Sequence, residues 1–290
     1  MSETVQIGVI GGSGLYSMPE IEDKRSIEVE TPFSKPSGNI ILGTLRGRRV
    51  AFLPRHGAGH RHTPSAIPQR ANIYALKSLG VRFIIAVNAC GSLREDYAPG
   101  HVVIPDQLFD YTLDRGERSF FGSGLVAHIS TADPFDEALR QQLIASSTAC
   151  GGTVHSKGTF IIEDGPRFAT RAESHIFRAW GCDIIGMTTA PEAFLAREAE
   201  IAYATMAHIT DYDSWHENEA PVTVDMVVAT FNRNIQLAQQ VIAHVVEHLN
   251  INQTTPSHQA LDGAIMTGRD ALDPAVMDAL RPIVARALGL

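Results

Sequence analysis

The stretch ANIYALKSLGVRFIIAVNACGS (71–92) decides which fold we expect. Residues 68–79 carry apolar side chains at helical spacing, and Gly80 follows them. Residues 83–87 (FIIAV) form a short, wholly apolar run, which is typical of a buried strand. A similar apolar run at 5–10 comes earlier in the chain and ends at glycines. An apolar strand, then a helix, then another apolar strand predicts an α/β sheet with parallel strands.

The same patterns extend this prediction along the chain. The further strands we expect are 39–45, 49–53, 101–104, 153–163, 182–185 and 201–209, the first two joined as a hairpin around residues 46–48. The further helices we expect are 136–150, 169–180, 190–199, a long amphipathic helix at 222–249 and a C-terminal helix from Asp273 to about Leu288. Residues 106–127 are expected to form a long loop that acts as a lid or an interface element.

The only plausible linker is at residues 252–258. We therefore expect one domain at 1–250 and a segment at 251–290 that consists of this linker and a C-terminal helical appendage. The apolar spacing of that appendage predicts a helix that packs on the same domain.

The bulk composition restricts the possible functions. The chain has 290 residues, 44% of them hydrophobic, which is enough for a substantial core. Its net charge of −8 argues against general nucleic-acid binding, which needs a basic surface. Three cysteines without metal-ligand spacing favour a reducing compartment. No signal peptide or membrane-spanning run is recognised, so we expect a cytoplasmic protein with no membrane partner.

A glycine-rich turn follows the first expected strand, in GVIGGSGLY (8–16). The dinucleotide-binding register fails because Ser17 stands where a glycine is needed, and no Gly-Lys pair completes a nucleotide-binding P-loop. A turn with several backbone N–H groups and the Ser13 hydroxyl is suited to one phosphate. A plain tight turn is the alternative.

A second polar segment, LPRHGAGHRHTP (53–64), follows another expected strand. Arg55 offers a planar set of N–H donors that fits a phosphate, and His56 adds another donor. Zinc binding is an alternative reading of the histidines, but their spacing lacks the helical His pair with an acid that metalloproteases use. A solvated basic loop is the other alternative.

Two more segments, VNACGSLRED (87–96) and GMTTAPEA (186–193), place small or hydroxylated residues where a strand ends. Both segments could line one ligand. Thr188 and Thr189 could equally be N-caps of the helix that Pro191 and Glu192 begin.

The stretch TDYDSW (210–215) ends an apolar strand with two acids. Parallel sheets bind ligands at the carboxyl ends of their strands, where Asp211 and Asp213 could hold amines or move protons. A solvated loop is the alternative.

Taken in order, these segments resemble the methylthioadenosine phosphorylase branch of the trimeric purine nucleoside phosphorylases. The matching strings are IGVIGGSGLY, TPFSKPSG, RHG, ANIYALKSLG, NACGSLRE, PGHVVIPDQ, EDGPRFATRAESHIFRAWGCDIIGMTTAPEA and TDYDSWHE. They span roughly residues 5 to 250, which makes the resemblance far more specific than any single motif.

The resemblance implies a nucleoside phosphorylase domain with a central mixed, partly parallel sheet flanked by helices. It implies a homotrimer that cleaves S-methyl-5′-thioadenosine with phosphate, giving adenine and 5-methylthioribose 1-phosphate in purine and methionine salvage. Inorganic phosphate would be a co-substrate, and no cofactor or metal is expected.

The resemblance also implies a set of site residues. Phosphate would be held by Ser13, Arg55, His56, Asn88, Ala89 and Thr188. Met187 would lie against the ribose, Phe168 against the base, and Val224 and Val227 against the methylthio group. His128 would reach into a neighbouring subunit's site, which Pro64 helps to line. Tyr212 stands between the two acids, and Ala169 and Val224 are candidate specificity positions.

The acid pair fits the chemistry of adenine. One carboxyl group can deliver a proton to N7 as the glycosidic bond breaks, and an ionised one can accept from the 6-amino group. When two acids lie close together and are shielded from water, their pKa values tend to differ. We therefore expect Asp211 to act at N7 and Asp213 to support the amine.

Two positions depart from the animal members of the branch. Asn88 and Gly186 stand where those members carry Thr and Asn, as in relatives that cleave methylthioinosine or other 6-oxopurine nucleosides. Those relatives lack the first acid, so 6-aminopurine is favoured here. The alternatives are a methylthioinosine or broader purine nucleoside phosphorylase, and a non-catalytic nucleoside-binding protein on the same fold.

Overall fold

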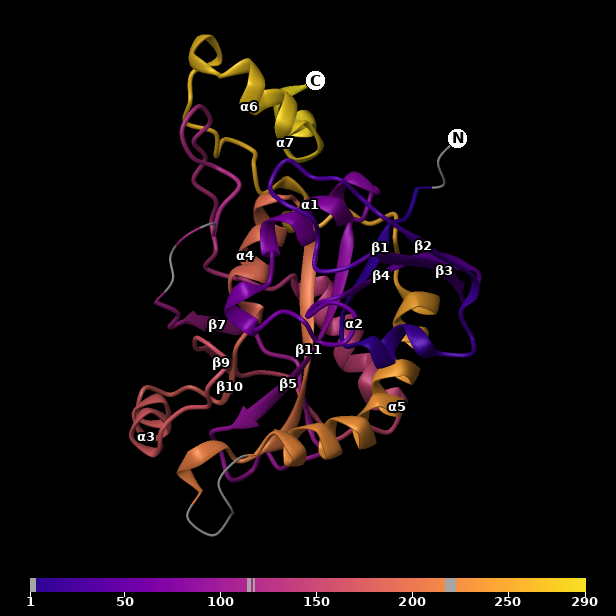
Figure 1. The fold of residues 1–290 in the computed structure, drawn as a ribbon, viewed down its shortest axis with the longest axis vertical. Helices are drawn as coiled ribbons and strands as arrows, with labels where there is room; N and C mark the ends of the chain where they lie inside the picture. The colour runs from indigo at the N-terminus through magenta and orange to yellow at the C-terminus, as the bar shows by residue number, and fades with distance from the viewer. Residues whose placement is uncertain (1–3, 114–115, 117, 217–222) are drawn as a thin grey trace.

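A mixed, partly parallel sheet with helices on both faces forms the body of the protein (Figure 1). The computed structural model describes residues 4–113, 116, 118–216 and 223–290, with the backbone alone for 13, 16, 226–229 and 231–233. The strands are β1 (Ile7–Gly11), β2 (Glu22–Ile27), β3 (Ile40–Leu45), β4 (Arg48–Pro54), β5 (Phe83–Ser92), β6 (Val102–Val103), β7 (Gln107–Asp110), β8 (Val154–His155), β9 (Thr159–Ile162), β10 (Ile184–Gly186) and β11 (Ala202–Asp211). The α-helices are α1 (Gln69–Ser78), α2 (Glu137–Ala149), α3 (Arg171–Ala179), α4 (Thr189–Glu198), α5 (Val224–His248), α6 (Pro274–Ala279) and α7 (Arg281–Leu288). The expected fold class is confirmed.

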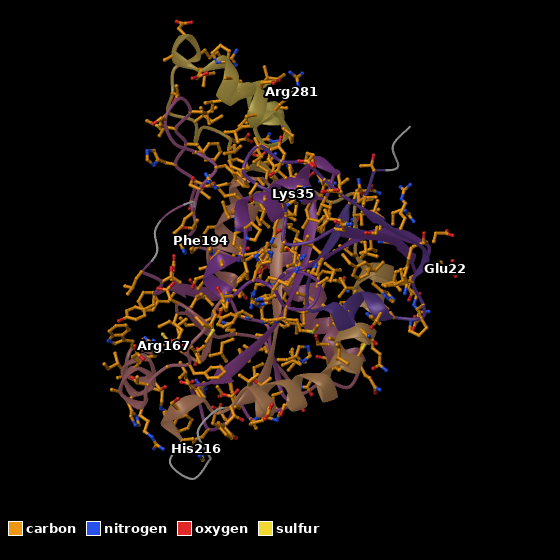
Figure 2. All side chains as sticks on the ribbon, viewed as in Figure 1. Glu22, Lys35, Arg167, Phe194, His216 and Arg281 are labelled. Carbon is orange, nitrogen blue, oxygen red and sulfur yellow. The ribbon has the colours of Figure 1, made fainter. Side chains whose placement is uncertain are left out.

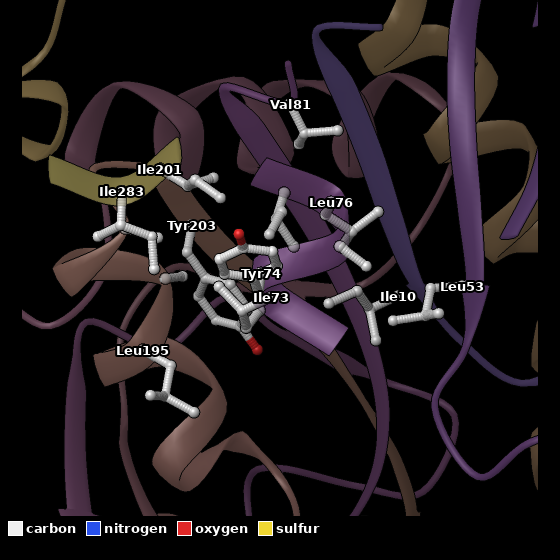
Figure 3. Packing of buried hydrophobic residues seen from close by; sticks show 14 of the residues in the cluster. Ile10, Leu53, Ile73, Tyr74, Leu76, Val81, Leu195, Ile201, Tyr203 and Ile283 are labelled. Carbon is white, nitrogen blue, oxygen red and sulfur yellow. The ribbon is translucent and has the colours of Figure 1, made fainter. Parts of the chain in front are cut away.

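The central strands are apolar throughout because both of their faces are covered. Along β5, Phe83 and Ile85 pack into one hydrophobic cluster, whereas Ile84 and Ala86 pack into another on the opposite face. Residues of α2 and α5 complete the first cluster, and residues of α1, α4 and α7 complete the second. Figure 3 shows part of the second cluster, where Tyr203 of β11 packs among side chains of α1 and α4. A strand buried on both faces loses the polar alternation of a surface strand.

The strand β5 changes its neighbour halfway along one edge. Its residues 83–86 pair in parallel with β1, and Gly91 and Ser92 pair antiparallel with β10. Its other edge pairs with β11 along nearly its whole length. The registers leave residues 87–90 between the ends of β1 and β10, so the sheet opens beside Asn88 and Ala89.

The C-terminal segment packs on the main body, where α7 contacts α1 (Figure 1). Leu280, Ile283 and Val284 are buried in the cluster with α1 and α4. The expectation of one continuous helix to Leu288 was wrong, because Pro282 separates α6 from α7. The expected division of the chain at residue 250 stays a prediction.

The expected linker at 252–258 is also more ordered than its polar composition indicates. A 3-10 helix, η4 (Pro256–Gln259), begins within it. Ser257 Oγ donates to Asp136 Oδ2 (2.7 Å), and His258 Nε2 lies 3.0 Å from Arg82 O. Tertiary hydrogen bonds therefore order a segment that has no apolar pattern of its own.

Other boundaries differ from expectation where strands are short or polar. The expected strand at 153–163 is two strands, β8 and β9, which pair with different neighbours. The predicted loop at 106–127 contains β7. The exposed strand β2 (EDKRSI) was not predicted, since it pairs only with β3 and has no apolar alternation. The expected hairpin is confirmed by the antiparallel pairing of β3 with β4.

We expect Asp136→Ala to lower the free energy of unfolding by about 2 kcal/mol. Asp136 is buried, caps α2 by accepting from Leu139 N (3.0 Å), and also accepts from Ser257. Urea unfolding followed by circular dichroism measures the change. Asp273→Ala is the matched control, because Asp273 caps α6 from an exposed position. An equal loss in both variants would contradict a special role for the buried cap.

Candidate active site

Four of the predicted phosphate residues follow or occupy strands that end beside the opening in the sheet. Arg55 follows β4, Asn88 and Ala89 lie in the second half of β5, and Thr188 follows β10. Arg55 N donates to Gly11 O (3.0 Å), which ties the end of β4 to the end of β1. The carboxyl ends of neighbouring strands thus bring residues from distant parts of the sequence together.

The Arg55 guanidinium is buried and held by a carboxylate from α4. Nε and Nη2 each donate to Glu192 at 2.8 Å, and Nη1 donates to Val87 O at 2.8 Å. Tyr203 Oη donates to the same carboxylate at 2.7 Å. A guanidinium has five N–H groups, so two remain beyond these three bonds, and the Tyr203 hydroxyl also interacts with the guanidinium. Arg55 is therefore rigidly oriented with donors to spare.

Asn88 and Thr188 are joined across the opening. Asn88 Nδ2 donates to Thr188 Oγ1 (2.8 Å), and Thr205 Oγ1 donates to Asn88 Oδ1 (2.6 Å). Thr188 stands at the N-cap of α4, yet its side chain makes no capping hydrogen bond. Its hydroxyl accepts from Asn88, so its proton is available to another acceptor. This geometry favours the ligand role over the capping role.

His56 differs from the donor that we expected. Its Nδ1 lies 2.9 Å from His62 O, and a carbonyl oxygen only accepts, so Nδ1 carries the proton. Burial, the largest effect, lowers the pKa of His56 to about 4. The ring is therefore neutral near pH 7 and Nε2 is an acceptor. In this neutral state Nε2 offers no donor, and His56 as a phosphate ligand stays a prediction.

The two acids lie together at the far end of β5. Asp211 ends β11, and Asp213 begins a 3-10 helix, η3 (Asp213–Trp215). Asp211 Oδ1 accepts from Asp213 N (2.8 Å), and Asp211 Oδ2 accepts from Thr210 Oγ1 (2.7 Å). A Cβ on Gly91 would lie 3.1 Å from Asp211 Oδ1 and from Asp213 Cβ, so glycine lets β5 approach both acids.

Both acids are buried, and this sets their proton affinity. Burial raises the pKa of Asp211, against the hydrogen bonds from Thr210 and Asp213. Burial also raises the pKa of Asp213 to about 6, although Ser174 Oγ donates to its carboxylate. Asp213 has a φ of 51°, which is rare for a residue with a side chain. Such backbone strain is common at functional sites.

The residues around the acids form an apolar wall. Trp215 Nε1 donates to Ser92 O (2.7 Å) and anchors η3 on the end of β5. Ala169 is buried with Trp215 in one hydrophobic cluster, against which Tyr212 packs. Figure 2 labels His216, which follows η3, and Arg167, which precedes Phe168, at the same end of the molecule. Phe168 itself is half-buried.

Pro64 and Met187 meet on another side of the site. A Cβ on Gly165 would lie 2.6 Å from Pro64 Cγ and 2.8 Å from Met187 Sδ, so Gly165 lies against both residues. Pro64 and Met187 also line a cavity of about 240 Å³ that Gln69, Arg118 and Asp164 help to form. This cavity adjoins the site through Met187, and the acids and Arg55 do not line it.

Gly186, one of the two departures from the animal pattern, has a local explanation. A Cβ at this position would lie 2.9 Å from two carbon atoms of the Phe160 ring. Phe160 is fully buried. The large ring of β9 therefore occupies the space that a side chain at 186 would need.

The remaining predicted residues are exposed, or their side chains lie outside the described part of the chain. Val224 begins α5 and is 65% exposed, and the side chains of Ser13 and Val227 lie outside the described residues. His128 is exposed beside the C-terminal segment, where its N–H donates to Ala264 O (2.9 Å). In Figure 2 that segment, marked by Arg281, lies at the opposite end from Arg167 and His216. A role for His128 thus requires another subunit.

Several residues that shape the site were not predicted from sequence. They are Glu163, Ser174, Thr205 and Thr210, together with Glu192, which was read only as part of a helix start. An acid inside the mostly apolar segment that follows Thr188 and Thr189 was the available signal for Glu192. Ser174, Thr205 and Thr210 carried no signal in the sequence. The hydroxyl group of each one makes a hydrogen bond to a residue distant in sequence, or to a neighbour that already had an expected role.

Metal sites and membrane spans were sought as well. Among the residues described above, no group of three or more His, Cys, Asp or Glu side chains could hold a metal ion. Over those same residues, no helix is both long and apolar enough to cross a membrane. Cys90, Cys150 and Cys182 are free thiols.

Comparison with known proteins identifies the family. The phosphorylase superfamily profile matches residues 6–247. The S-methyl-5′-thioadenosine phosphorylase of Chloroflexus aurantiacus is 52% identical over 280 residues, which cover 97% of each chain. A crystal structure of methylthioadenosine phosphorylase from an Antarctic soil metagenomic library has a TM-score of 0.92 at 47% identity, covering 97% of this chain and 99% of that one. The Schistosoma mansoni methylthioadenosine phosphorylase in complex with adenine has a TM-score of 0.81 at 39% identity, covering 88% and 96%. The chain therefore belongs to the phosphorylase superfamily, in the family of these methylthioadenosine phosphorylases.

Proposed function

We propose that this protein cleaves S-methyl-5′-thioadenosine by phosphorolysis, releasing adenine and 5-methylthioribose 1-phosphate. One observation carries the proposal: a set of anion donors and a buried acid pair lie beside successive parts of the strand β5. Asn88 marks the donors and Gly91 marks the acids, and three residues of a strand span about 10 Å. That spacing suits a phosphate on one side of a sugar and a base on the other.

The donor set fits an inorganic phosphate. Arg55 has two N–H groups beyond its bonds to Glu192 and Val87, with Tyr203 also nearby, and Thr188 keeps its hydroxyl proton. Glu192 offsets the charge of Arg55, so phosphate would be held mainly by oriented donors. Oriented donors need little rearrangement as charge develops on the reacting groups.

The acid pair fits a departing adenine. Asp213 would accept from the 6-amino group as an ionised carboxylate. Asp211 would deliver a proton to N7 as the bond between the base and the sugar breaks. The sugar then carries positive charge, and the phosphate dianion stabilises it and attacks C1′. One bond breaks, one forms, and the proton on N7 leaves with adenine.

The relatives support this assignment of substrate. The proteins compared above are named as methylthioadenosine phosphorylases, and one was crystallised with adenine. We also propose a homotrimer in which His128 of a neighbouring subunit completes the site. A cytoplasmic location and the absence of any cofactor, nucleic-acid partner or membrane partner belong to the same proposal. The division into residues 1–250 and 251–290 is proposed as well.

We expect Asp211→Asn to slow adenine release by about 100-fold or more, because general acid catalysis is typically worth that much. Adenine formation from methylthioadenosine, with and without phosphate, measures the effect. The same assay with adenosine, methylthioinosine and inosine separates the proposed function from a broader purine nucleoside phosphorylase. Asp96→Asn is the control, since Asp96 is an exposed acid paired with Arg94. Near-normal turnover by the Asp211 variant would remove this residue from the acid role.

We expect Glu192→Gln to raise the KM for phosphate by about tenfold and to change the KM for the nucleoside little, because a buried bidentate pair orients Arg55. Initial rates at varied phosphate concentration measure both constants. Since breaking a buried ion pair can unfold a protein, Tyr203→Phe is a milder second variant that removes one donor to Glu192. An unchanged KM for phosphate in both variants would refute the orienting role.

We expect methylthioadenosine to bind more weakly as the pH falls through about 6. The pKa of Asp213 is raised to about 6, so the carboxylate that accepts from the amine is ionised above that pH and protonated below it. Calorimetric titration without phosphate is the measurement, because orthophosphate itself changes charge near neutral pH. Asp213→Asn should bind weakly at every pH from 5 to 8. A wild-type affinity that is constant over this range would contradict the assignment.

A further inference from the structure

Thr210 precedes the first acid in β11, and the proposed function gives it no role. Ile209 pairs with Cys90 of β5. Asp211, two residues further along β11, pairs with Gly91, which is only one residue further along β5. Thr210 is therefore an extra residue in β11, without a pairing partner on β5. Extra residues of this kind redirect side chains and are common next to active sites.

This irregularity brings two neighbouring side chains together. Successive side chains of a regular strand point to opposite faces of the sheet. Here Thr210 Oγ1 lies 2.7 Å from Asp211 Oδ2, and both residues are buried. The same hydroxyl group lies 3.2 Å from Cys90 O on β5. One hydroxyl group is therefore within hydrogen-bond distance of two oxygen atoms.

The Thr210 hydroxyl group has one proton, so it donates to only one of these two oxygens at a time. Cys90 O is a carbonyl oxygen and only accepts. Asp211 Oδ2 accepts when the carboxyl group is ionised, and it donates when it carries a proton. The protonation state of Asp211 thus decides which way the Thr210 hydroxyl group points.

The proton of Asp211 belongs on Oδ2 and not on Oδ1. Asp211 Oδ1 accepts from the backbone N–H of Asp213 (2.8 Å), which can only donate. Oδ2 faces the Thr210 hydroxyl group, which can also accept. In the acid form Oδ2–H therefore has an acceptor within reach, and in the ionised form Oδ2 has a donor.

We propose that Thr210 is a positioning residue whose hydroxyl group turns from Cys90 O to Asp211 Oδ2 as Asp211 gives its proton to N7 of the base. This inference rests on the proposed function, in which N7 receives that proton. The Oδ2–H bond breaks and the N7–H bond forms, while the Thr210 proton stays on its own oxygen and only changes its acceptor. The carboxylate that appears gains a hydrogen bond that the acid form lacks. Thr210 thereby stabilises charge where it develops during the reaction.

Two other titratable groups lie close enough to act on Asp211. Burial, the largest effect, and the Asp211 charge raise the pKa of the Cys90 thiol well above its usual value, so this thiol stays neutral. Asp213 has a pKa raised to about 6 and changes its charge in the working range of pH. Burial raises the pKa of Asp211, and the hydrogen bond from Thr210 opposes that effect. Removal of the hydroxyl group should therefore raise the pKa of Asp211 further.

The first test measures the titration of Asp211 without substrate. Infrared difference spectra follow the C=O band of its protonated carboxyl group, which is identified by its absence in Asp211→Asn. The titration is made in an Asp213→Asn background, so that the neighbouring acid does not overlap. Thr210→Val replaces the hydroxyl group with a methyl group, and we expect Asp211 to titrate about 1 pH unit higher, because a hydrogen bond to an ionised group is worth about tenfold or more. Thr210→Ser keeps the hydroxyl group and should titrate as its parent does.

The second test is the ratio of the wild-type kcat to the Thr210→Val kcat for methylthioadenosine, from pH 5 to 9 at saturating phosphate. We expect a ratio of about ten at low pH, where Asp211 is protonated in both proteins. At high pH the ratio should approach one, because the variant transfers the proton more slowly but retains it more often by the same factor. Titration of phosphate affects both proteins alike and cancels. The KM for the nucleoside should stay unchanged, since Thr210 acts through Asp211.

Thr112→Val is the matched control. Thr112 is also buried, and its hydroxyl group donates to a nearby carboxylate, Asp110 Oδ1 (2.7 Å). This substitution should leave the titration of Asp211 and kcat as in the wild type.

Three results would overturn the inference. They are an unchanged titration of Asp211 in Thr210→Val, a kcat ratio that is the same at every pH, and a loss of kcat that persists in Thr210→Ser. Wild-type enzyme that releases no base with phosphate would instead refute the proposed function, whatever the infrared titration gives.

Discussion

The change of partner along β5 is the constraint on which the site depends. One edge of this strand pairs with β1 at its start and with β10 at its end, so residues 87–90 are left beside an opening in the sheet. Pairing with β11 along the other edge keeps the strand rigid across that opening. Backbone groups such as Val87 O thus become available to side chains, and Arg55 uses that oxygen. A sheet with continuous pairing at this point would bury the same atoms in its ladder.

Around the opening, buried charge is balanced group by group. The Arg55–Glu192 pair is nearly inaccessible to water. Arg55 also donates to Val87 O, and Glu192 also accepts from Tyr203 Oη. Such a pair contributes little net stability, because desolvating two ions costs about as much as their attraction returns. Its benefit is orientation. Around the acids, burial raises the pKa values of Asp211, Asp213 and Glu163, which disfavours the charged form of each.

One chain brings together the side chains proposed to bind phosphate and the two acids proposed to bind the base. Val224 is exposed at the start of α5, and His128 lies beside the C-terminal segment, away from the acids. The proposed trimer gives a physical reason for both observations, because a neighbouring subunit would cover exposed apolar side chains and exclude water. Exclusion of water strengthens the electrostatic interactions within a site.

The sequence by itself determined the fold class, the order of the main strands and helices, and the two acids at the end of β11. Long apolar runs and helical spacing are local signals, so they can be read from the sequence without knowledge of the fold. Only the tertiary structure decided the contacts of Glu192 and Thr205, the burial of Glu163, the hydrogen bond that holds the His56 ring and the order within 252–258. Each of these depends on a partner distant in sequence or on burial. The partner exchange of β5 was likewise invisible, because hydrogen-bond pairing between strands leaves no pattern in a continuously apolar run.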